Sequence, residues 1–447
     1  MYDPLQQSVI PRDHERGVHS YWAAHTVLPP VAEHALPDRT DVVVIGAGYT
    51  GLNAAITLAR DYQREVVLID AGAIGAGCSS RNAGFLLPGT GRLGFADYQR
   101  KFGADVAQAV QNEFAASLAH VDAAVDSASV SCDLIPSRYL RLAHSAKMGR
   151  SLQAQQALYQ PTLLDAEWVS PSELQETIPG ISWSHGALAI TPARSVNPRA
   201  LVGVYLEQAQ TAGVLCVPHH PVIDWQTSGS PNSRGDNAPH RIVTEQGAIR
   251  CNQVLICANG YLSKQPFAAL SQRHFPVLSS ILVTRPLTAA EQAENGLRST
   301  DMMMDTRTLK YYYRLLPDGR LLFGGRGAVS GSESTHPRHR ARLERALAQT
   351  FPRLRQLTTD FYWSGWVSVS FDAMPRVYSP SSGVFTSMGY CGAGVAFASL
   401  AGKRLAQKAA GDKLPELPFY HGELPRFPFP SLRRAALRAM YAWSALR

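Results

Sequence analysis

The sequence predicts an α/β protein that combines a parallel sheet with a separate α+β domain built on a largely antiparallel sheet. Residues 41–70 give the first indication, because they show a strand, a glycine-rich turn, a helix and a second strand in that order. The second indication is a group of strands within residues 275–370, two of which flank the hairpin turn Pro317-Asp318-Gly319. At 447 residues the chain also exceeds one ordinary hydrophobic core, so two domains are expected.

Composition argues against several classes of protein. Hydrophobic residues make up 45% and charged residues 17% of the chain, which is typical of soluble globular proteins. No apolar run approaches the roughly 18–20 residues of a membrane span, and the polar start of the chain lacks a signal core, so we expect no secretion. The six cysteines form no CxxC pair, which favours a reducing cytoplasm and disfavours a metal site or a disulfide framework.

The net charge of +8 is modest for this length. Its clearest cluster is Arg433, Arg434 and Arg438, within a helix predicted at residues 432–446. We expect no nucleic-acid partner, because that would need a denser basic stripe with interleaved aromatic residues. Packing of this helix on the body of the protein is favoured over its attachment to a membrane surface.

The unit at residues 41–70 has the parts that bind a dinucleotide. Gly46 allows a tight turn, Gly48 lets the backbone approach a pyrophosphate, and Gly51 lets the helix pack closely on the strand. The helix N-terminus offers unpaired N–H groups to the phosphates. Asp70 ends the second strand, where a carboxylate would accept both ribose hydroxyls. The alternative is a plain strand–turn–helix unit, but the strand, the helix and the acid all agree with a Rossmann-like dinucleotide site.

Helices and strands follow in turn along the rest of the chain. Residues 75–85 form a loop of small residues that is either a ligand-facing segment or a flexible surface loop. Helices are predicted at 104–126, after the capping box that begins at Ser170, from Asn197 to Gly213, and around 338–350. Strands are predicted at 214–225, 241–243, 248–251, 254–258, 276–285, 311–316, 320–324 and 361–369.

A second glycine-rich turn from strand to helix lies near the end of the chain. The strand is predicted at residues 384–388, the turn at 389–395 and the helix at 396–410. Like the first turn, it directs a helix N-terminus, with its positive dipole end, at an electron-rich group.

Four separated motifs resemble the D-amino-acid-oxidase-like FAD oxidoreductases, and within them the gamma-glutamylputrescine oxidases. They are VVVIGAGYTGL, SSRNAGF, YYYRLLPDGRLLFGG and MGYCGAGVAFASLAGKRLA, and the resemblance extends from Ser20 to the C-terminal helix. It implies a Rossmann-like FAD-binding domain of the GR2 type at about 1–90, 145–265 and 370–430. It also implies an α+β substrate domain at about 91–144 and 266–369, with a C-terminal helix at about 431–447.

The resemblance implies which residues hold the FAD. The pyrophosphate and the adenosine ribose are expected at Gly46, Gly48, Tyr49, Thr50, Gly51, Asp70 and Ala71. The flavin and its phosphates are expected along Ser80, Arg81 and Asn82, the adenine at Val222, and the ribityl chain near Ala258, Asn259 and Gly260. Backbone N–H groups of Gly392, Gly394 and Val395 are expected at the pyrimidine edge of the flavin, where they would stabilise the charge left by an arriving hydride.

The chain departs from the family at two positions of the second glycine turn. The family usually shows G-Y-S-G-H-G-V there, whereas this chain has Cys391 and Ala393 in place of the Ser and the His. The missing imidazole points to a different substrate or to a different tuning of the flavin. Some relatives attach FAD through a cysteine before the final strand, but residues 366–374 contain none, so the FAD is expected to be non-covalent.

The implied reaction is oxidation of a C–N bond in an amine or amino acid, with hydride transfer from the alpha carbon to the flavin and hydrolysis of the resulting imine. Electrons would then pass to oxygen or to a respiratory acceptor. The first expectation for the substrate is a gamma-glutamylputrescine-like amine. The alternatives are a cyclic imino acid such as pipecolate or proline, a D-amino acid, or, in another class, a flavin-binding protein without its own turnover.

The hairpin at residues 311–326 is expected to face the flavin, as the resemblance implies. Three residues are expected at the substrate: Arg326 to meet a substrate carboxylate, Tyr312 to wall the pocket, and Trp366 on the next strand. The alternative is that Arg326 only lies at the edge of the sheet and that Tyr312 and Trp366 are ordinary core residues.

Overall fold

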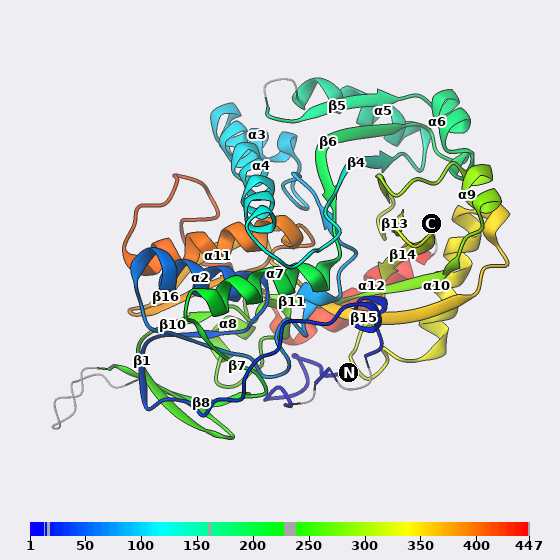
Figure 1. The fold of residues 1–447 in the computed structure, drawn as a ribbon. Helices are drawn as coiled ribbons and strands as arrows, with labels where there is room; N and C mark the ends of the chain where they lie inside the picture. The colour runs from blue at the N-terminus through cyan, green and yellow to red at the C-terminus, as the bar shows by residue number, and fades with distance from the viewer. Residues whose placement is uncertain (13, 16–17, 160–161, 228–237, 446–447) are drawn as a thin grey trace.

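The computed structural model describes residues 1–12, 14–15, 18–159, 162–227 and 238–445 (Figure 1). Within these residues the strands form one sheet of eight strands and one of nine. The first sheet and its helices lie at one end of the molecule and the second sheet lies at the other, as Figure 1 shows. Within the same described residues, no helix is long and apolar enough to cross a membrane.

The first sheet has the order β16-β17-β10-β1-β2-β7, in which every neighbouring pair except β16 and β17 is parallel. Val42 and Val44 of β1 face one core cluster, whereas Val43 and Ile45 face another on the opposite side of the sheet. The sheet is therefore covered on both faces, which explains why this strand is a continuous apolar run without polar alternation. The strands of this sheet are β1 (Arg39–Ile45), β2 (Val66–Ile69), β7 (Leu215–Val217), β8 (Val222–Thr227), β9 (His240–Thr244), β10 (Gly247–Ile256), β16 (Arg376–Ser381) and β17 (Val384–Met388).

The helices α2 (Tyr49–Tyr62), α4 (Ala104–Asp126), α7 (Pro198–Thr211) and α11 (Gly394–Ala410) pack together on this sheet. At Gly402 a Cβ would lie 2.3 Å from the carbonyl oxygen of Thr50, so α11 and α2 cross at a distance that only glycine permits. The side chain of Asn197 accepts hydrogen bonds from the N–H groups of Arg199 and Ala200, which confirms the predicted start of α7.

The second sheet has the order β15-β11-β14-β13-β12-β4-β6-β3, with β5 paired to β6. Its pairs are antiparallel except for β12 and β4, so the prediction of an α/β protein with a second, largely antiparallel sheet is confirmed. The strands are β3 (Phe85–Leu86), β4 (Ile135–Leu142), β5 (Asp165–Val169), β6 (Ala187–Ser195), β11 (Phe275–Pro286), β12 (Asp301–Asp305), β13 (Tyr312–Leu315), β14 (Arg320–Arg326) and β15 (Thr359–Val369).

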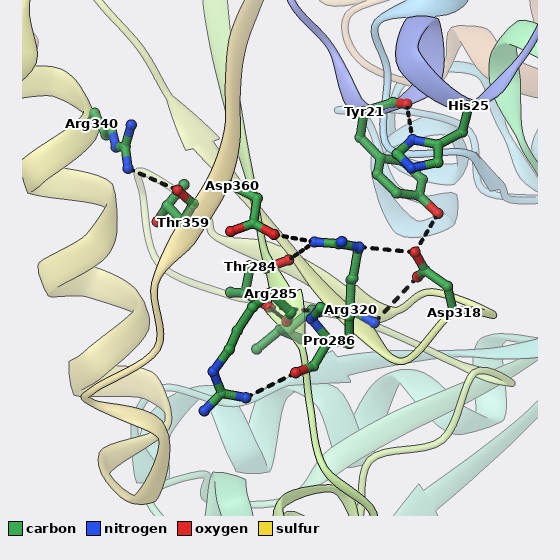
Figure 2. A network of polar contacts seen from close by, with 11 residues as sticks. Tyr21, His25, Thr284, Arg285, Pro286, Asp318, Arg320, Arg340, Thr359 and Asp360 are labelled. Atoms are coloured by element: carbon green, nitrogen blue, oxygen red, sulfur yellow. Dashed lines mark hydrogen bonds and ion pairs between the residues drawn. The ribbon is translucent and has the colours of Figure 1, made fainter.

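A polar network fixes the outer end of the β13–β14 hairpin (Figure 2). The Arg320 guanidinium donates to the carbonyl oxygen of Thr284 at 2.8 Å and forms ion pairs with Asp318 and Asp360. The hydroxyl of Tyr21, from α1 (Tyr21–His25), donates to Asp318 at 2.8 Å. The predicted turn is therefore tied to β11, to β15 and to the N-terminal segment.

Several helices complete the fold. They are α3 (Phe95–Phe102), α5 (Ala146–Gln155), α6 (Pro171–Thr177), α8 (Ala268–Ser271), α9 (Ala289–Asn295), α10 (Pro337–Thr350) and α12 (Arg433–Ala445). The predicted C-terminal helix is thus present as α12, and residues 446–447 lie outside the described part of the chain.

The structure corrects two strand predictions. The strand expected at residues 214–225 is divided into β7 and β8 by the segment 218–221, which contains two prolines. The two short strands expected at 248–251 and 254–258 form the single strand β10.

The boundary between the two domains also differs from the expected one. Residues 145–265 were expected in the first domain, but β5 and β6 pair in the second sheet. We therefore propose that residues 145–197 belong to the substrate domain.

Candidate functional site

A cavity of about 1020 Å³ opens at the carboxyl ends of the parallel strands. Ile45, Ile69 and Cys257 line it from the ends of β1, β2 and β10. Ile281 and Tyr312 line it from the second sheet, so the cavity lies between the two sheets. Open α/β sheets bind ligands beyond the carboxyl ends of their strands.

The first glycine turn shapes the wall below α2. Gly46 has a φ of +103°, and a Cβ there would lie 2.9 Å from the carbonyl carbon of Cys257, so glycine is required on two counts. At Gly51 a Cβ would lie 1.8 Å from the carbonyl oxygen of Gly46, so this glycine lets α2 begin directly against the turn. Gly48 lines the cavity at the start of the helix, where a Cβ would lie 2.7 Å from Ser79 Oγ. The N-terminus of α2 is therefore accessible to a ligand.

Polar side chains surround the start of α2. Ser79 Oγ accepts a hydrogen bond from the Tyr49 N–H at 3.0 Å. The hydroxyl of Thr50 lies 2.7 Å from that of Tyr390, which in turn lies 2.7 Å from Ser387 Oγ. These bonds hold Tyr390 of the second glycine turn against the helix that begins at the first.

Asp70 lies at the end of β2, on the cavity wall beside Ala71. Its carboxylate accepts hydrogen bonds from the N–H groups of Ala47 at 2.7 Å and Gly72 at 2.9 Å. Burial raises the pKa of Asp70 to about 6, although both backbone bonds act in the opposite direction. Val222, at the start of β8, lines the same cavity as Asp70.

The loop of small residues after β2 is held by its own side chains. Asn82 Oδ1 accepts from the Gly84 N–H at 2.7 Å, and its amide donates to the carbonyl oxygen of Ser79 at 2.9 Å. Ser80 Oγ donates to the carbonyl oxygen of Gly75 at 2.6 Å, so Ser80 closes the loop and is not among the residues that line the cavity. Asn82 and its neighbour Arg81 do line it.

Arg81 is a buried cation on this wall. Its guanidinium lies 5.8 Å from the ring centroid of Tyr261 and donates to the Tyr261 hydroxyl at 3.4 Å. Tyr261 follows Ala258, Asn259 and Gly260, the predicted segment after β10, and all three of those residues line the cavity.

The segment after β10 joins the two halves of the site. Asn259 Oδ1 accepts a hydrogen bond from the Gly389 N–H at 3.1 Å, which connects it to the second glycine turn. At Gly260 a Cβ would lie 2.8 Å from the carbonyl oxygen of Trp366, so this backbone runs against β15 at a distance that only glycine permits.

The second glycine turn directs α11 at the cavity. Cys391 and Gly392 have positive φ values of 54° and 98°, and α11 begins directly after them with Ala393 as its N-cap. Among the described residues, no side chain caps this end of the helix. Gly392, Gly394 and Val395 line the cavity, so unpaired backbone N–H groups and the positive end of the helix dipole lie next to a ligand there.

Two of the three predicted substrate residues line the opposite wall. The Tyr312 hydroxyl lies 2.8 Å from Ser279 Oγ, and burial raises the pKa of Tyr312 to about 12. The ring of Tyr312 lies across Gly324, where a Cβ would be 2.0 Å from it. Arg326 ends β14 and lines the cavity, and its guanidinium has no ion-pair partner in the described part of the chain.

Trp366 does not line the cavity. It is fully buried, and its indole N–H donates to the carbonyl oxygen of Tyr2 at 2.8 Å. Gly365 and Val367, its neighbours on β15, do line the cavity, and side chains alternate between the two faces of a strand. The expectation that Trp366 faces the substrate is therefore replaced by a role in the core on the other face of the sheet.

Several cavity residues were missed by the sequence reasoning. Ser79 lies within the SSRNAGF motif and Tyr390 within the second glycine turn, so the motifs themselves could have indicated both. Arg141 and Lys310 also line the cavity, but Arg141 lies on β4, which was not predicted, and Lys310 precedes β13.

Two helix N-termini and an acid at the end of β2, with a second sheet as the facing wall, are the features of a dinucleotide-binding α/β protein. Residues 41–408 match the model of the FAD dependent oxidoreductase family, and the chain belongs to this family. The predictions of the D-amino-acid-oxidase-like family, of an FAD-dependent enzyme and of FAD as its cofactor are confirmed.

Relatives match over nearly the whole chain. A probable oxidoreductase OrdL from Rhizobium meliloti is 30% identical over 92% of this chain and 92% of its own. A gamma-glutamylputrescine oxidoreductase from Escherichia coli is 26% identical over 88% of this chain and 91% of its own. Among solved structures, glycine oxidase from Geobacillus kaustophilus has a TM-score of 0.70 at 20% identity, covering 88% of this chain and 100% of its own, which supports the fold.

Proposed function

We propose that the protein oxidises a C–N bond of an amine or amino acid, and that the imine product is then hydrolysed. When bound, FAD would supply the chemistry by accepting a hydride from the alpha carbon of the substrate. The observation that carries the proposal is the uncapped N-terminus of α11, which lines the same cavity as Tyr312 and Arg326 on the opposite sheet. The names of the relatives, a gamma-glutamylputrescine oxidoreductase and a glycine oxidase, support an amine or amino-acid substrate.

The residues on the cavity wall fit FAD. Gly48 and the start of α2 suit a pyrophosphate, because Gly48 lines the cavity at the helix N-terminus without a side chain of its own. Asp70 is oriented by two backbone bonds to accept ribose hydroxyls. Gly392, Gly394 and Val395 would stabilise negative charge at the edge of the ring system.

We propose that the FAD is held without a covalent bond. Cys78, Cys257 and Cys391 line the cavity, but burial raises the pKa of each thiol, which disfavours the reactive thiolate. Cys391 also donates to the carbonyl oxygen of Gly389 at 3.1 Å. Acid precipitation of the holoenzyme should leave all the flavin in the supernatant, whereas flavin retained in the pellet would indicate a covalent bond.

Arg326 and Tyr312 are the proposed substrate residues. Arg326 would bind a substrate carboxylate, and the ring of Tyr312, fixed across Gly324 and bonded to Ser279, would orient the amine against the cofactor. The segment 308–310 and Met440 of α12 also line the cavity and would help to exclude water.

A gamma-glutamylputrescine-like amine is the first substrate proposed, with cyclic imino acids and D-amino acids as the alternatives. A flavin-binding protein without turnover is the second candidate function, because Ala393 and Cys391 replace the His and Ser that the family usually carries. The electron acceptor is proposed to be oxygen or a respiratory carrier.

Anaerobic addition of these amines to the holoenzyme tests the proposal. We expect one class to bleach the visible flavin band, because the substrate reduces the bound cofactor. If the band persists with every class, the role without turnover is favoured. Steady-state kinetics test Arg326, because Arg326→Ala should raise KM for a substrate with a carboxylate and leave KM for a neutral amine unchanged. An equal rise in KM for both substrates would show that Arg326 does not bind a substrate carboxylate.

A further inference from the structure

Positive side chains gather around Arg326 on the cavity wall that the second sheet forms. Arg141 of β4 pairs in register with Met304 of β12, and Met304 pairs with Tyr312 of β13. Directly paired residues lie on the same face of a sheet. Arg141, Met304 and Tyr312 all line the cavity, so Arg141 is part of the same wall as the proposed substrate residue Tyr312.

Lys310 and Arg326 lie on the same wall, two residues along the chain from Tyr312 and Gly324. Tyr312 pairs with Gly324, Lys310 precedes Tyr312 by two residues, and Arg326 follows Gly324 by two. Because β13 and β14 are antiparallel, both displacements lead to the same end of the hairpin, and both side chains line the cavity. The pKa of Lys310 is lowered to about 8, by burial first and then by the positive charges of Arg141, Arg92 and Arg326.

Acidic partners are scarce at this end. The acids among the described residues that line the cavity are Asp70, at the end of β2, and Asp97, which is paired with Arg100. Asp305 is the acid that acts on Lys310, but its side chain is buried in an ion pair with Arg307 and also accepts from the N–H groups of Arg307 and Tyr311.

Arg141 itself donates to a neutral acceptor, Gln155 Oε1, at 3.0 Å. Within the described residues, neither Lys310 nor Arg92 has an ion-pair partner. Like charges held together without counter-charges oppose folding, so an arrangement of this kind points to an anionic ligand.

The phosphates of the cofactor do not account for this cluster. They are proposed at the start of α2, on the first sheet, where Gly48 and Arg81 line the cavity. The cluster belongs instead to β4, to the β12–β13 connection and to β14, on the facing sheet.

We propose that Arg141 and Lys310 form a second anion subsite beside Arg326, so that the substrate carries two carboxylates. This inference rests on the proposed reaction and narrows its substrate class to amines that bear two acidic groups. It therefore favours an acidic amino acid over the gamma-glutamylputrescine-like amine and the cyclic imino acids, each of which carries one carboxylate. Arg141 offers the planar fork that binds a carboxylate in a bidentate manner, and Lys310 adds a point charge. A substrate amine with a positive charge at its far end would be repelled by the same cluster.

Binding of unreactive carboxylates to the holoenzyme tests the subsite without turnover. Glutarate, with two carboxylates, and butyrate, with one, would be titrated while the perturbation of the visible flavin band is recorded. Glutarate should bind about tenfold more tightly than butyrate, as expected for one additional charge-assisted contact. Arg141→Gln and Lys310→Gln should each remove most of that preference and leave the affinity for butyrate unchanged.

Two variants serve as controls. Arg141→Lys keeps the charge and should retain part of the preference, which a purely structural role of Arg141 would not predict. Arg345→Gln removes an exposed cation on α10, outside the cavity, and should leave both affinities unchanged. Equal binding of glutarate and butyrate by the unaltered protein would overturn the inference, as would an equal loss of both ligands in the Gln variants.

The proposed function is judged separately by the bleaching of the flavin band with amines. If amines bleach the band but glutarate shows no preference, the second subsite is wrong and the C–N oxidation stands. If glutarate is preferred but no amine bleaches the band, the subsite stands and the proposed reaction is wrong.

Discussion

Single residues shape the cavity at positions where no other side chain fits, and Gly46 is the clearest of them. Gly46→Ala would place a Cβ 2.9 Å from the backbone of Cys257 and would strain a φ of +103°. Gly213→Ala is a matched control, because its φ is +78° but its Cβ would meet no atom within 4 Å. Both should lose roughly 1 kcal/mol or more of unfolding free energy. Only Gly46→Ala should also lose flavin. The ratio of the visible flavin absorbance to the protein absorbance in the ultraviolet measures that loss.

Asp70 should make the stability of the flavin-free protein depend on pH. Its folded-state pKa is raised from 3.8 to about 6 by burial, so the folded state binds the proton more tightly than the unfolded state does. The stability that this provides is present below about pH 4 and is lost as pH rises through about pH 6. Relative to Asp70→Asn, the free energy of unfolding should fall by up to about 3 kcal/mol over that interval in denaturant titrations. A constant difference between the two proteins would contradict the burial of this carboxyl.

At the same scale, a larger share of the expected cofactor residues than of the expected substrate residues lines the cavity. Gly46, Gly48 and Asp70 belong to one local unit whose parts follow each other in the chain, so their positions could be inferred from spacing. The orientation of Trp366 could not be inferred from spacing, because it depends on which face of β15 meets the cavity. A shift of one residue reverses every side chain of a strand.

At the scale of elements, α11 carries the second half of the site. Its N-terminus lacks a side-chain cap in the described structure, and Ala393 is the N-cap. Ala393→Ser and Ala393→Asp should both stabilise the flavin-free protein, by up to about 1 kcal/mol in thermal unfolding. Only the aspartate should slow the anaerobic reduction of the flavin, because its charge opposes the negative charge that arrives there. Equal rates of flavin reduction in the two variants would show that the N-terminus of α11 does not lie next to the flavin ring.

Elements with local signals were predicted, and those that depend on distant partners were missed. The strand at 384–388 matches β17, and the helix near 338–350 matches α10 (Pro337–Thr350). In contrast, β4 and β6 were not predicted, although they pair with each other over most of their length. Each contains a proline and several polar residues, Pro136 and Pro192 among them, so their stability comes from pairing and not from an apolar pattern.

At the scale of the whole molecule, contacts between the chain ends hold the second sheet. Asp3 forms a buried ion pair with Arg434 of α12 and accepts a hydrogen bond from the Gly331 N–H at 2.8 Å. The Arg434 guanidinium also lies 5.3 Å from the ring centroid of Trp366. Asp3 and Arg434, from the two ends of the sequence, therefore meet beside Trp366, behind the substrate wall.

Breaking this ion pair should destabilise the whole protein. Arg434→Met leaves the buried Asp3 carboxylate without its partner and should cost about 3–5 kcal/mol of unfolding free energy. Asp3→Asn combined with Arg434→Met should cost less than the sum of the two single changes, because no buried charge then remains unpaired. Additive losses in denaturant titrations would show that the two residues do not interact.

The central claim is that an amine bound in the cavity between the two sheets gives a hydride from its alpha carbon to the flavin. The most direct test is the anaerobic rate of flavin reduction in a stopped-flow experiment, with hydrogen or deuterium at the alpha carbon of the amine that bleaches the band most readily. The account predicts clearly slower reduction with deuterium. Identical rates would contradict hydride transfer as the rate-limiting step of reduction, and no reduction by any amine would contradict the claim as a whole.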